Sequence, residues 1–292
     1  MSVKRKRGER GRSRATLDLI TTSIKIIKAC QPVSVRGVCY KLFVAGLIES
    51  MMVGNTQKVS RILRDAREEG LIPWEWIVDE SRQLEHQPQW ENLEDYARSS
   101  ELGYRRDFWA DQAGRVIVIS EKGTVAGVLR PVLDAYGVPF FAAHGFNSAT
   151  KVHDLAAEIQ ADRRHYVFLY VGDHDPSGMY MSEVDFQERL KRYGAGDFTF
   201  QRIALTAEDT SSLPSFPAKK QDPRYAWYRK NYGAKAWELD AMDPNQLRER
   251  VETWVQGYVD AAAWERHKVI EEAQRKTTKM VAAKMAEMRT EI

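Results

Sequence analysis

Tyr166-Val-Phe-Leu-Tyr-Val-Gly-Asp-His-Asp-Pro-Ser-Gly178 is the stretch that decides the fold of this 292-residue chain. Its first six residues are apolar or aromatic on both alternating faces, which is typical of a strand buried in a parallel sheet. The strand leads into Asp173 and Asp175, which are two positions apart and so point to the same side of an extended chain. Because ligands of open α/β sheets bind at the carboxyl ends of the strands, two carboxylates are expected at the binding edge.

The aspartate pair has two interpretations. Two carboxylates this close are unfavourable unless a cation or a proton lies between them, and hard oxygen donors of this kind suit Mg²⁺. In the other interpretation, Asp175 is the N-cap of a helix that has Pro176 at its first position. The stretch alone does not separate the two.

Strands and helices alternate around this stretch. Strands are expected at 115–120, 139–143, 166–171 and 198–205, with helices at 124–135, 149–161 and from 176 to about 193. This alternation predicts an α/β fold with a mainly parallel sheet and right-handed crossovers. Glu121 follows the first strand as Asp173 and Asp175 follow the third, so three carboxylates are expected at one edge. Their convergence favours a metal site for Mg²⁺ or Mn²⁺.

The amino-terminal part of the chain predicts a helical DNA-binding domain. Three short helices are expected at 16–29, 34–46 and 55–70, followed by a strand or wing at 71–78. This order is typical of a winged helix-turn-helix domain, whose third helix enters a groove of DNA. That helix carries Lys58, Arg61 and Arg64. A solvated basic face without a nucleic-acid role is the alternative.

A basic arm precedes these helices. Net charge is only +3, but the first residues are rich in Lys and Arg, including Lys4, Arg5, Lys6 and Arg7. Such an arm suits contacts with the phosphates of double-stranded DNA. A solubilising tail is the alternative.

Tyr40 lies off the apolar face of the second helix. The core-facing stripe of that helix consists of Val35, Val38, Cys39 and Leu42. Tyr40 falls on the opposite side of the helix, which predicts that it faces solvent, and Arg36 lies one turn earlier on the same side. An exposed tyrosine without chemistry is the alternative.

Composition restricts the remaining possibilities. The only cysteines, Cys30 and Cys39, are too few for a disulfide framework or a zinc site, which favours a reducing cytoplasm. No apolar run is long enough to span a membrane, and no apolar segment follows the basic amino terminus as in a signal peptide. The phosphate-loop motif Gly-x-x-x-x-Gly-Lys-[Ser/Thr] does not occur, so any ATP-driven step requires another polypeptide.

We expect five regions along the chain. They are a basic arm at 1–15, a winged-helix domain at 16–80, a connector at 81–113, an α/β domain at 114–243 and a long helical tail at 244–292. In the α/β domain, residues 206–233 are rich in Ser, Pro, Lys and Tyr and are expected to be irregular. Glu238 and Asp240 either add acids near the site or begin a helix.

The acid after one strand and the Asp-x-Asp after a later one resemble the Toprim fold, which topoisomerases, bacterial primases and some nucleases share. Asp173-His-Asp-Pro-Ser-Gly178 is similar to the Asp-x-Asp-Pro-x-Gly of the topoisomerase VI A subunit and the meiotic double-strand-break protein, where a winged-helix domain precedes the Toprim domain. Arg36-Gly-Val-Cys-Tyr40 resembles the motif around their nucleophilic tyrosine, although Gly37 stands where the family often has an acid. The resemblance covers residues from about 16 to 205.

This resemblance implies Mg²⁺-dependent cleavage of double-stranded DNA by a nucleoid-associated cytoplasmic protein. Tyr40 would attack the phosphodiester, Arg36 would hold the phosphate, and Glu121, Asp173 and Asp175 would hold the metal. It also implies a homodimer, in which the tyrosine of one protomer meets the metal site of the other, and a possible separate ATPase B-type subunit. Two alternatives remain: a Toprim nuclease that uses water in place of the tyrosine, and a DNA-binding protein without catalysis.

Overall fold

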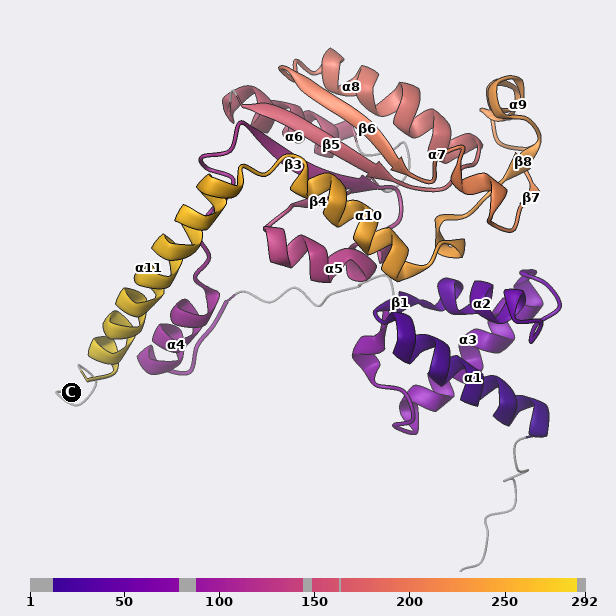
Figure 1. Ribbon diagram of the computed structural model, residues 1–292, viewed down its shortest axis with the longest axis horizontal. Helices are drawn as coiled ribbons and strands as arrows, with labels where there is room; N and C mark the ends of the chain where they lie inside the picture. Colours follow the sequence, from indigo (N-terminus) through magenta and orange to yellow (C-terminus); the bar gives the residue numbers. More distant parts are fainter. Residues whose placement is uncertain (1–12, 79–87, 144–148, 163, 288–292) are drawn as a thin grey trace, which may run out of the picture.

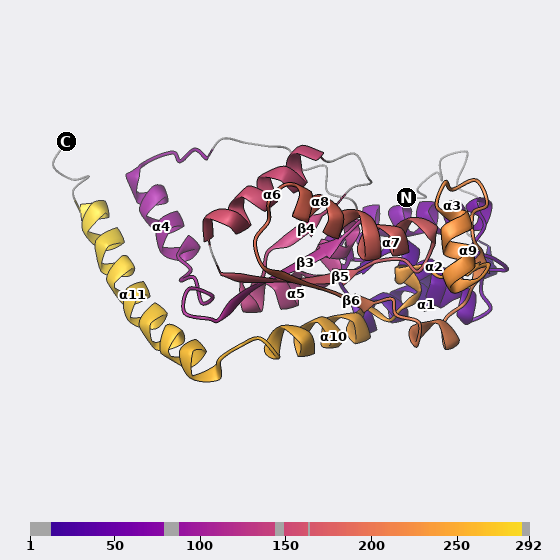
Figure 2. The same ribbon diagram turned by 90° about the horizontal axis from the view of Figure 1, so that it is seen from above.

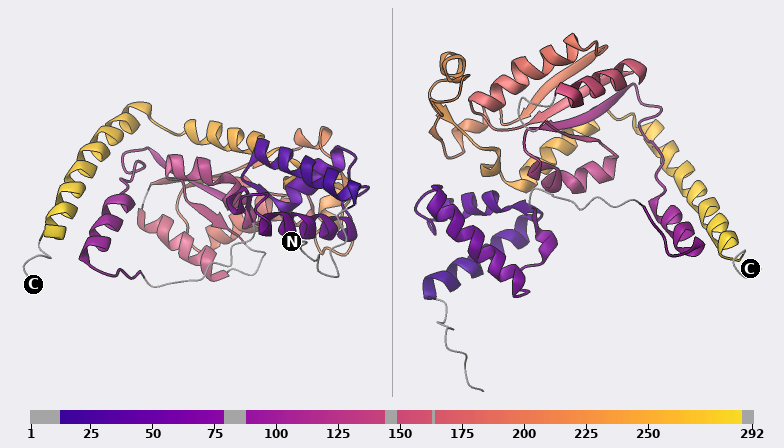
Figure 3. Two further views of the ribbon diagram at one scale, coloured as in Figure 1. Left: turned by 90° about the horizontal axis from the view of Figure 1, so that it is seen from below. Right: turned by 180° about the vertical axis from the view of Figure 1, so that it is seen from behind.

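The computed structural model describes residues 13–78, 88–143, 149–162 and 164–287. Figure 1 shows three parts: a helical unit at the amino terminus, a larger α/β unit, and an arm that extends from the α/β unit. The arm consists of α4 (Leu93–Gly103) and α11 (Ala261–Glu287), which lie side by side. The views from above, below and behind in Figures 2 and 3 show that the arm and the amino-terminal unit lie at opposite ends of the molecule.

The amino-terminal unit consists of α1 (Arg14–Cys30), α2 (Val35–Val44) and α3 (Val53–Glu68). Ser34 caps α2, because its Oγ accepts a hydrogen bond of 2.9 Å from the backbone N–H of Gly37. The three helices share one apolar core, and the predicted stripe of α2 contributes to it through Val38, Cys39 and Leu42. The helices expected from the sequence are therefore confirmed, with ends that differ by a few residues.

The segment after α3 differs from the wing that the sequence predicts. Residues Trp74–Trp76 form a 3₁₀ turn, and β2 (Ile77–Val78) pairs in parallel with β1 (Val33–Ser34). Within the described residues of this unit there is no antiparallel hairpin, so only the end of the predicted strand is observed. Arg67 holds the turn against α3, with its guanidinium carbon 4.3 Å from the ring centroid of Trp74.

The α/β unit is built on a four-stranded parallel sheet with the order β4-β3-β5-β6. The strands are β3 (Gly114–Ser120), β4 (Phe140–Ala142), β5 (His165–Val171) and β6 (Phe198–Ala204). All four strands that the sequence predicts are confirmed. In β5, every residue from Tyr166 to Val171 is buried, which explains why this strand is apolar on both faces.

Helices cover both faces of the sheet. One face packs against α5 (Thr124–Tyr136) and α10 (Pro244–Gln256), and the other packs against α6 (Ala149–Asp162) and α8 (Phe186–Arg192). The helix expected from 176 onward is interrupted. It consists of α7 (Pro176–Tyr180), a π-helical turn at Met181–Asp185, and then α8.

The segment between β6 and α10 is more ordered than its composition predicts. It contains short 3₁₀ turns at Asp209–Ser211 (η3) and Leu239–Ala241 (η4), the strand pair β7 (Phe216–Pro217) and β8 (Lys235–Ala236), and the helix α9 (Tyr225–Tyr232). The expectation of irregular structure is therefore wrong for this helix. Tyr228 of α9 is fully buried and packs with Met179 of α7, so tertiary contacts stabilise a segment with little local preference.

No helix in the parts of the chain described above is both long and apolar enough to cross a membrane. The arm helix α11 is long but polar around most of its circumference, and it is tied to the connector by hydrogen bonds. The hydroxyl of Tyr104 donates to Oε1 of Gln274 at 2.6 Å, and the backbone N–H of Arg106 donates to Oε2 of Glu271 at 2.9 Å.

Candidate active site at the carboxyl edge of the sheet

Glu121 and Asp173 follow the carboxyl ends of two neighbouring strands, β3 and β5. Gly178 at the start of α7 allows the two segments to approach closely because it has no Cβ. A Cβ at this position would lie 3.0 Å from Oε1 of Glu121 and closer still to the carbonyl oxygen of Asp173. Asp173 is 8% exposed. The structure therefore confirms that these carboxylates gather at one edge of the sheet.

The electrostatics of this edge show an excess of negative charge. Burial raises the pKa of Glu121 far above its usual range, and the nearby charges of Asp173 and Asp175 raise it further. Burial also raises the pKa of Asp173, while the ammonium of Lys122 acts in the opposite direction. Carboxyl groups that resist ionisation together become more acidic when a cation binds among them.

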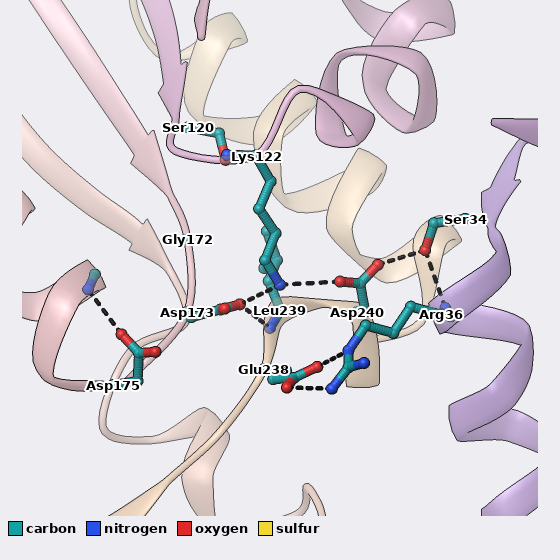
Figure 4. A network of polar contacts seen from close by, with 12 residues as sticks. Ser34, Arg36, Ser120, Lys122, Gly172, Asp173, Asp175, Glu238, Leu239 and Asp240 are labelled. Carbon is teal, nitrogen blue, oxygen red and sulfur yellow. Dashed lines mark hydrogen bonds and ion pairs between the residues drawn. The ribbon is translucent and has the colours of Figure 1, made fainter. Parts of the chain in front are cut away.

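Lys122 supplies one positive charge to this edge. Its Nζ lies 2.8 Å from Oδ1 of Asp173 and 3.0 Å from Oδ2 of Asp240, as Figure 4 shows. Burial would lower the pKa of Lys122, but the two carboxylates outweigh burial and raise that pKa above its ordinary value. Asp240 therefore lies near the site, as one interpretation of the sequence expects, whereas the sequence did not indicate the role of Lys122.

Asp175 caps α7. Its Oδ1 accepts a hydrogen bond of 2.8 Å from the backbone N–H of Gly178, and Pro176 occupies the first helical position. The N-cap interpretation is thus confirmed. It is compatible with the metal interpretation, because a carboxylate has two oxygens and can accept several bonds.

The three carboxylates match the donor preference of Mg²⁺, but they are not arranged around a common point. Among the described residues, no three His, Cys, Asp or Glu side chains form a ready-made set of ligands. Asp173 faces Lys122 and accepts a 2.7 Å hydrogen bond from the backbone N–H of Leu239, while Asp175 faces α7. Both of these contacts of Asp173 are made by Oδ1, so one ion could bind both carboxylates only through Oδ2 of Asp173 or after Asp173 turns away from Lys122.

Arg202 of β6 holds the loop that carries the aspartates. Its guanidinium donates to the carbonyl oxygens of Gly172, Asp173, Gly178 and Leu205 and to the hydroxyl of Ser182, at 2.7–3.2 Å. The same group lies over the ring of Tyr170, 4.8 Å from its centroid. Sequence reasoning missed this residue, because nothing in its local pattern indicates four acceptors that lie 20–30 residues earlier in the chain.

Tyr40 does not face solvent, so this expectation is wrong. Its side chain is 2% exposed, and its hydroxyl has no hydrogen-bond partner in the described part of the chain. The polar face of α2 packs against η4 of the α/β unit, which a helical wheel of the isolated unit cannot reveal. Burial raises the pKa of Tyr40 well above its usual range, and the nearby charge of Glu238 adds to this effect.

We call the contact between α2 and the residues around η4 the seam. Across it, Nε and Nη2 of Arg36 donate to the two carboxylate oxygens of Glu238, Ser34 donates to Asp240, and Lys41 pairs with Asp243. The guanidinium carbon of Arg36 lies 5.9 Å from the ring centroid of Tyr40, so the structure does bring the two candidate residues together. A cleft of about 500 Å³ opens beside the seam, and its lining includes Arg36 and Asp173.

The predicted DNA-contacting residues of α3 are exposed. Lys58, Arg61 and Arg64 follow one another at three-residue spacing, which places them along one side of the helix. Arg64 is partly neutralised, since it lies 2.6 Å from Asp65 and 3.6 Å from Glu68. Lys4, Arg5, Lys6 and Arg7 lie outside the described residues.

Comparison with known proteins does not assign this site. A scan against protein-family models found no matching family, and a search of curated proteins found no similar one.

Proposed function

We propose that this chain is a Mg²⁺-dependent DNA-binding and strand-cleaving protein of the topoisomerase VI A-like kind, with a winged-helix unit before a Toprim unit. The observation that supports it best is the gathering of Glu121, Asp173 and Asp175 at the carboxyl edge of the sheet. Burial, together with the nearby charges of Asp173 and Asp175, raises the pKa of Glu121, and a bound cation would favour the ionised form of all three. Arg36 and Tyr40 lie across the seam from this edge, on the face of α2 that meets the α/β unit.

In this proposal, Glu121, Asp173 and Asp175 hold Mg²⁺, which neutralises charge that develops on the phosphate. The hydroxyl oxygen of Tyr40 attacks the phosphorus after losing its proton, a bond from phosphorus to a sugar oxygen breaks, and that sugar oxygen leaves with a proton. One phosphoester replaces another, so no external energy source is required. Arg36 orients the phosphate through paired hydrogen bonds.

The burial of Tyr40 adds a requirement to this mechanism. A tyrosine that is 2% exposed cannot contact DNA, so the seam must open before it can react. In the homodimer that the resemblance implies, opening would free Tyr40 of one protomer to reach the carboxylates of the other. Two symmetric attacks would then break both strands. An ATPase subunit that drives the opening would be a separate polypeptide.

A water-using nuclease is the second candidate function. The raised pKa and the burial of Tyr40 favour it, because both make the phenol a poor nucleophile in the conformation described. In this case, Glu121, Asp173 and Asp175 would still hold the metal, and Arg36 would still hold the phosphate.

Plasmid cleavage tests the function that both candidates share. Supercoiled plasmid is incubated with the protein and Mg²⁺ or Mn²⁺, and cut forms are quantified on a gel. We expect Asp173→Asn to lose at least about tenfold in rate, because loss of even a side chain that only orients a metal ligand typically costs about 10- to 100-fold. Asp154→Asn, at an exposed site on α6 where the side chain is 70% accessible, is the matched control and should cut normally. Equal cutting by both variants would exclude the site.

A further inference from the structure

Glu238 and Asp240 form ion pairs with cationic side chains on the two sides of the seam: Glu238 with Arg36 of α2, and Asp240 with Lys122 of the α/β unit. We propose that they form a latch, an autoinhibitory contact that takes the place of a DNA phosphate until DNA displaces it. This inference rests on the proposed DNA-binding function. It adds a regulated step, namely that the closed seam limits access to Arg36, Lys122 and Tyr40.

The pairing of Glu238 with Arg36 has the geometry that a phosphate would use. Two guanidinium nitrogens of Arg36 donate to the two oxygens of one carboxylate, and a phosphate can accept the same fork of hydrogen bonds. The side chain of Arg36 is 42% exposed, while that of Glu238 is 17% exposed. An incoming anion can therefore reach Arg36 from solvent and compete for it.

Asp240 makes the second half of the latch. One of its oxygens accepts from the hydroxyl of Ser34 on β1, and the other lies 3.0 Å from Nζ of Lys122 after β3. A single carboxylate thus connects the amino-terminal unit to the candidate metal edge, as Figure 4 shows. The backbone between Glu238 and Asp240 is also held at this edge, because the N–H of Leu239 donates a hydrogen bond to Asp173.

The cleft changes from neutral to positive when Glu238 and Asp240 leave it. Three cationic side chains (Arg36, Lys122 and Lys219) and three acidic ones (Asp173, Glu238 and Asp240) line the cleft of about 500 Å³. Withdrawal of Glu238 and Asp240 leaves three cations against one acid. Lys219 is exposed and makes no ion pair with the residues that the structure describes, so it is the cation that a phosphate would meet first.

The latch makes a quantitative prediction about DNA affinity. If DNA binds fully only to the open form, the apparent Kd equals the intrinsic Kd divided by the open fraction. Loss of one partly exposed ion pair raises that fraction by about two- to fivefold, and the apparent Kd falls by the same factor.

The test measures the Kd of the full chain for a fluorescein-labelled DNA duplex by anisotropy, with EDTA present to prevent cleavage. Glu238→Gln should bind about two- to fivefold more tightly than wild type. Glu238→Asp keeps the charge but shortens the reach to Arg36, and it should also bind more tightly. Glu272→Gln removes a charge from α11, where the side chain is 70% exposed, and should leave the Kd unchanged. Lys219→Gln should weaken binding.

A double-mutant cycle separates a latch from a general charge effect. If Glu238 acts by masking Arg36, the gain from Glu238→Gln disappears in the Arg36→Gln background. Hydrogen exchange gives a second readout, because the N–H groups of Leu239 and Ala241 are bonded in the closed seam and should exchange faster when DNA is added. Circular dichroism confirms that each variant is folded.

Each outcome has a distinct meaning. If wild type binds DNA and neither Glu238 variant binds more tightly, the latch is wrong and the proposed function stands. A gain that persists without Arg36 also overturns the latch, in favour of simple electrostatics. If neither wild type nor any Glu238 variant binds DNA, the proposed function fails, and the latch fails with it.

Discussion

Nζ of Lys122 lies 2.8 Å from Oδ1 of Asp173, so a side chain of the protein itself provides a cation at the edge of the sheet where we propose that Mg²⁺ binds. The same ammonium reaches Asp240, which belongs to the seam. The candidate metal site and the seam are therefore coupled through one lysine, and a change on either side should be detectable on the other.

Replacing Lys122 should destabilise the protein and make it depend on Mg²⁺. Lys122→Met leaves Asp173 and Asp240 without their counter-ion, which costs about 3 kcal/mol of unfolding free energy for a largely buried pair. Added Mg²⁺ should then raise the Tm of the variant more than that of wild type, because binding to the folded state is stabilising. Differential scanning fluorimetry with and without Mg²⁺ measures both effects.

Lys276→Met is the control, because Lys276 pairs with Glu272 on the exposed surface of α11. Its Tm should change little, with or without the ion. An equal response of both variants to Mg²⁺ would contradict the role of Lys122.

Mg²⁺ binding should strengthen as the pH rises. The pKa of Glu121 is raised, so its carboxyl group is partly protonated near neutral pH and must lose a proton before it can bind the ion. Affinity therefore increases as the pH rises towards this pKa of about 8 and levels off above it. Isothermal titration calorimetry in buffers of different ionisation enthalpy detects the released proton. Glu121→Gln should remove the rise near pH 8 and leave only the dependence at lower pH that comes from the raised pKa of Asp173, and a wild-type affinity that is flat or falls with pH would argue against this site.

Gly178 should be required for the site, whereas a glycine at the opposite edge of the sheet should not. Gly178→Ala places a Cβ against the carbonyl oxygen of Asp173 and against the side chain of Glu121. The side chain can move aside, but the backbone carbonyl of Asp173 cannot do so easily. We expect a loss of about 2 kcal/mol of stability and weaker Mg²⁺ binding. Gly196→Ala has open space around its Cβ and should be close to neutral. Chemical denaturation measures the unfolding free energy of both variants.

The exposed cations of α3 should contribute unequally to DNA affinity. Lys58→Ala and Arg61→Ala should each weaken binding of every sequence and reduce the slope of log K against log salt by about one. Arg64→Ala should have a smaller effect, because Asp65 and Glu68 already compete for this guanidinium. Anisotropy titrations at several salt concentrations measure the slopes. Slopes that stay at the wild-type value in all three variants would show that α3 does not lie on the DNA.

The sequence predicted the parallel sheet and its carboxyl edge because those features are encoded locally. A strand buried on both faces must be apolar throughout, as residues 166–171 are, and the acids directly follow such strands. The cap of α7 by Asp175 was predictable for the same reason, since the cap and the Pro at the next position form one short motif.

The parts that the sequence did not predict depend on contacts between distant segments. Tyr40 is buried by η4, about 200 residues later in the chain, so the pattern of α2 alone places it on the wrong side of an interface. α9 is stabilised by the burial of Tyr228 against the loop of His174, whose Nδ1 lies 2.9 Å from the tyrosine hydroxyl. Arg202 likewise acts on carbonyl groups that carry no side-chain signal.

The most direct test of the central claim is whether DNA cut in the presence of Mg²⁺ carries covalently attached protein at Tyr40. Cleavage is stopped with detergent, and the products are separated with and without protease digestion. Tyr40→Phe removes a buried hydroxyl without a partner, so the variant should be as stable as wild type, and any loss of activity is then chemical. We predict protein-linked DNA ends for wild type and none for Tyr40→Phe. Protein-free ends that persist in Tyr40→Phe would contradict the tyrosine mechanism and identify a water-using nuclease.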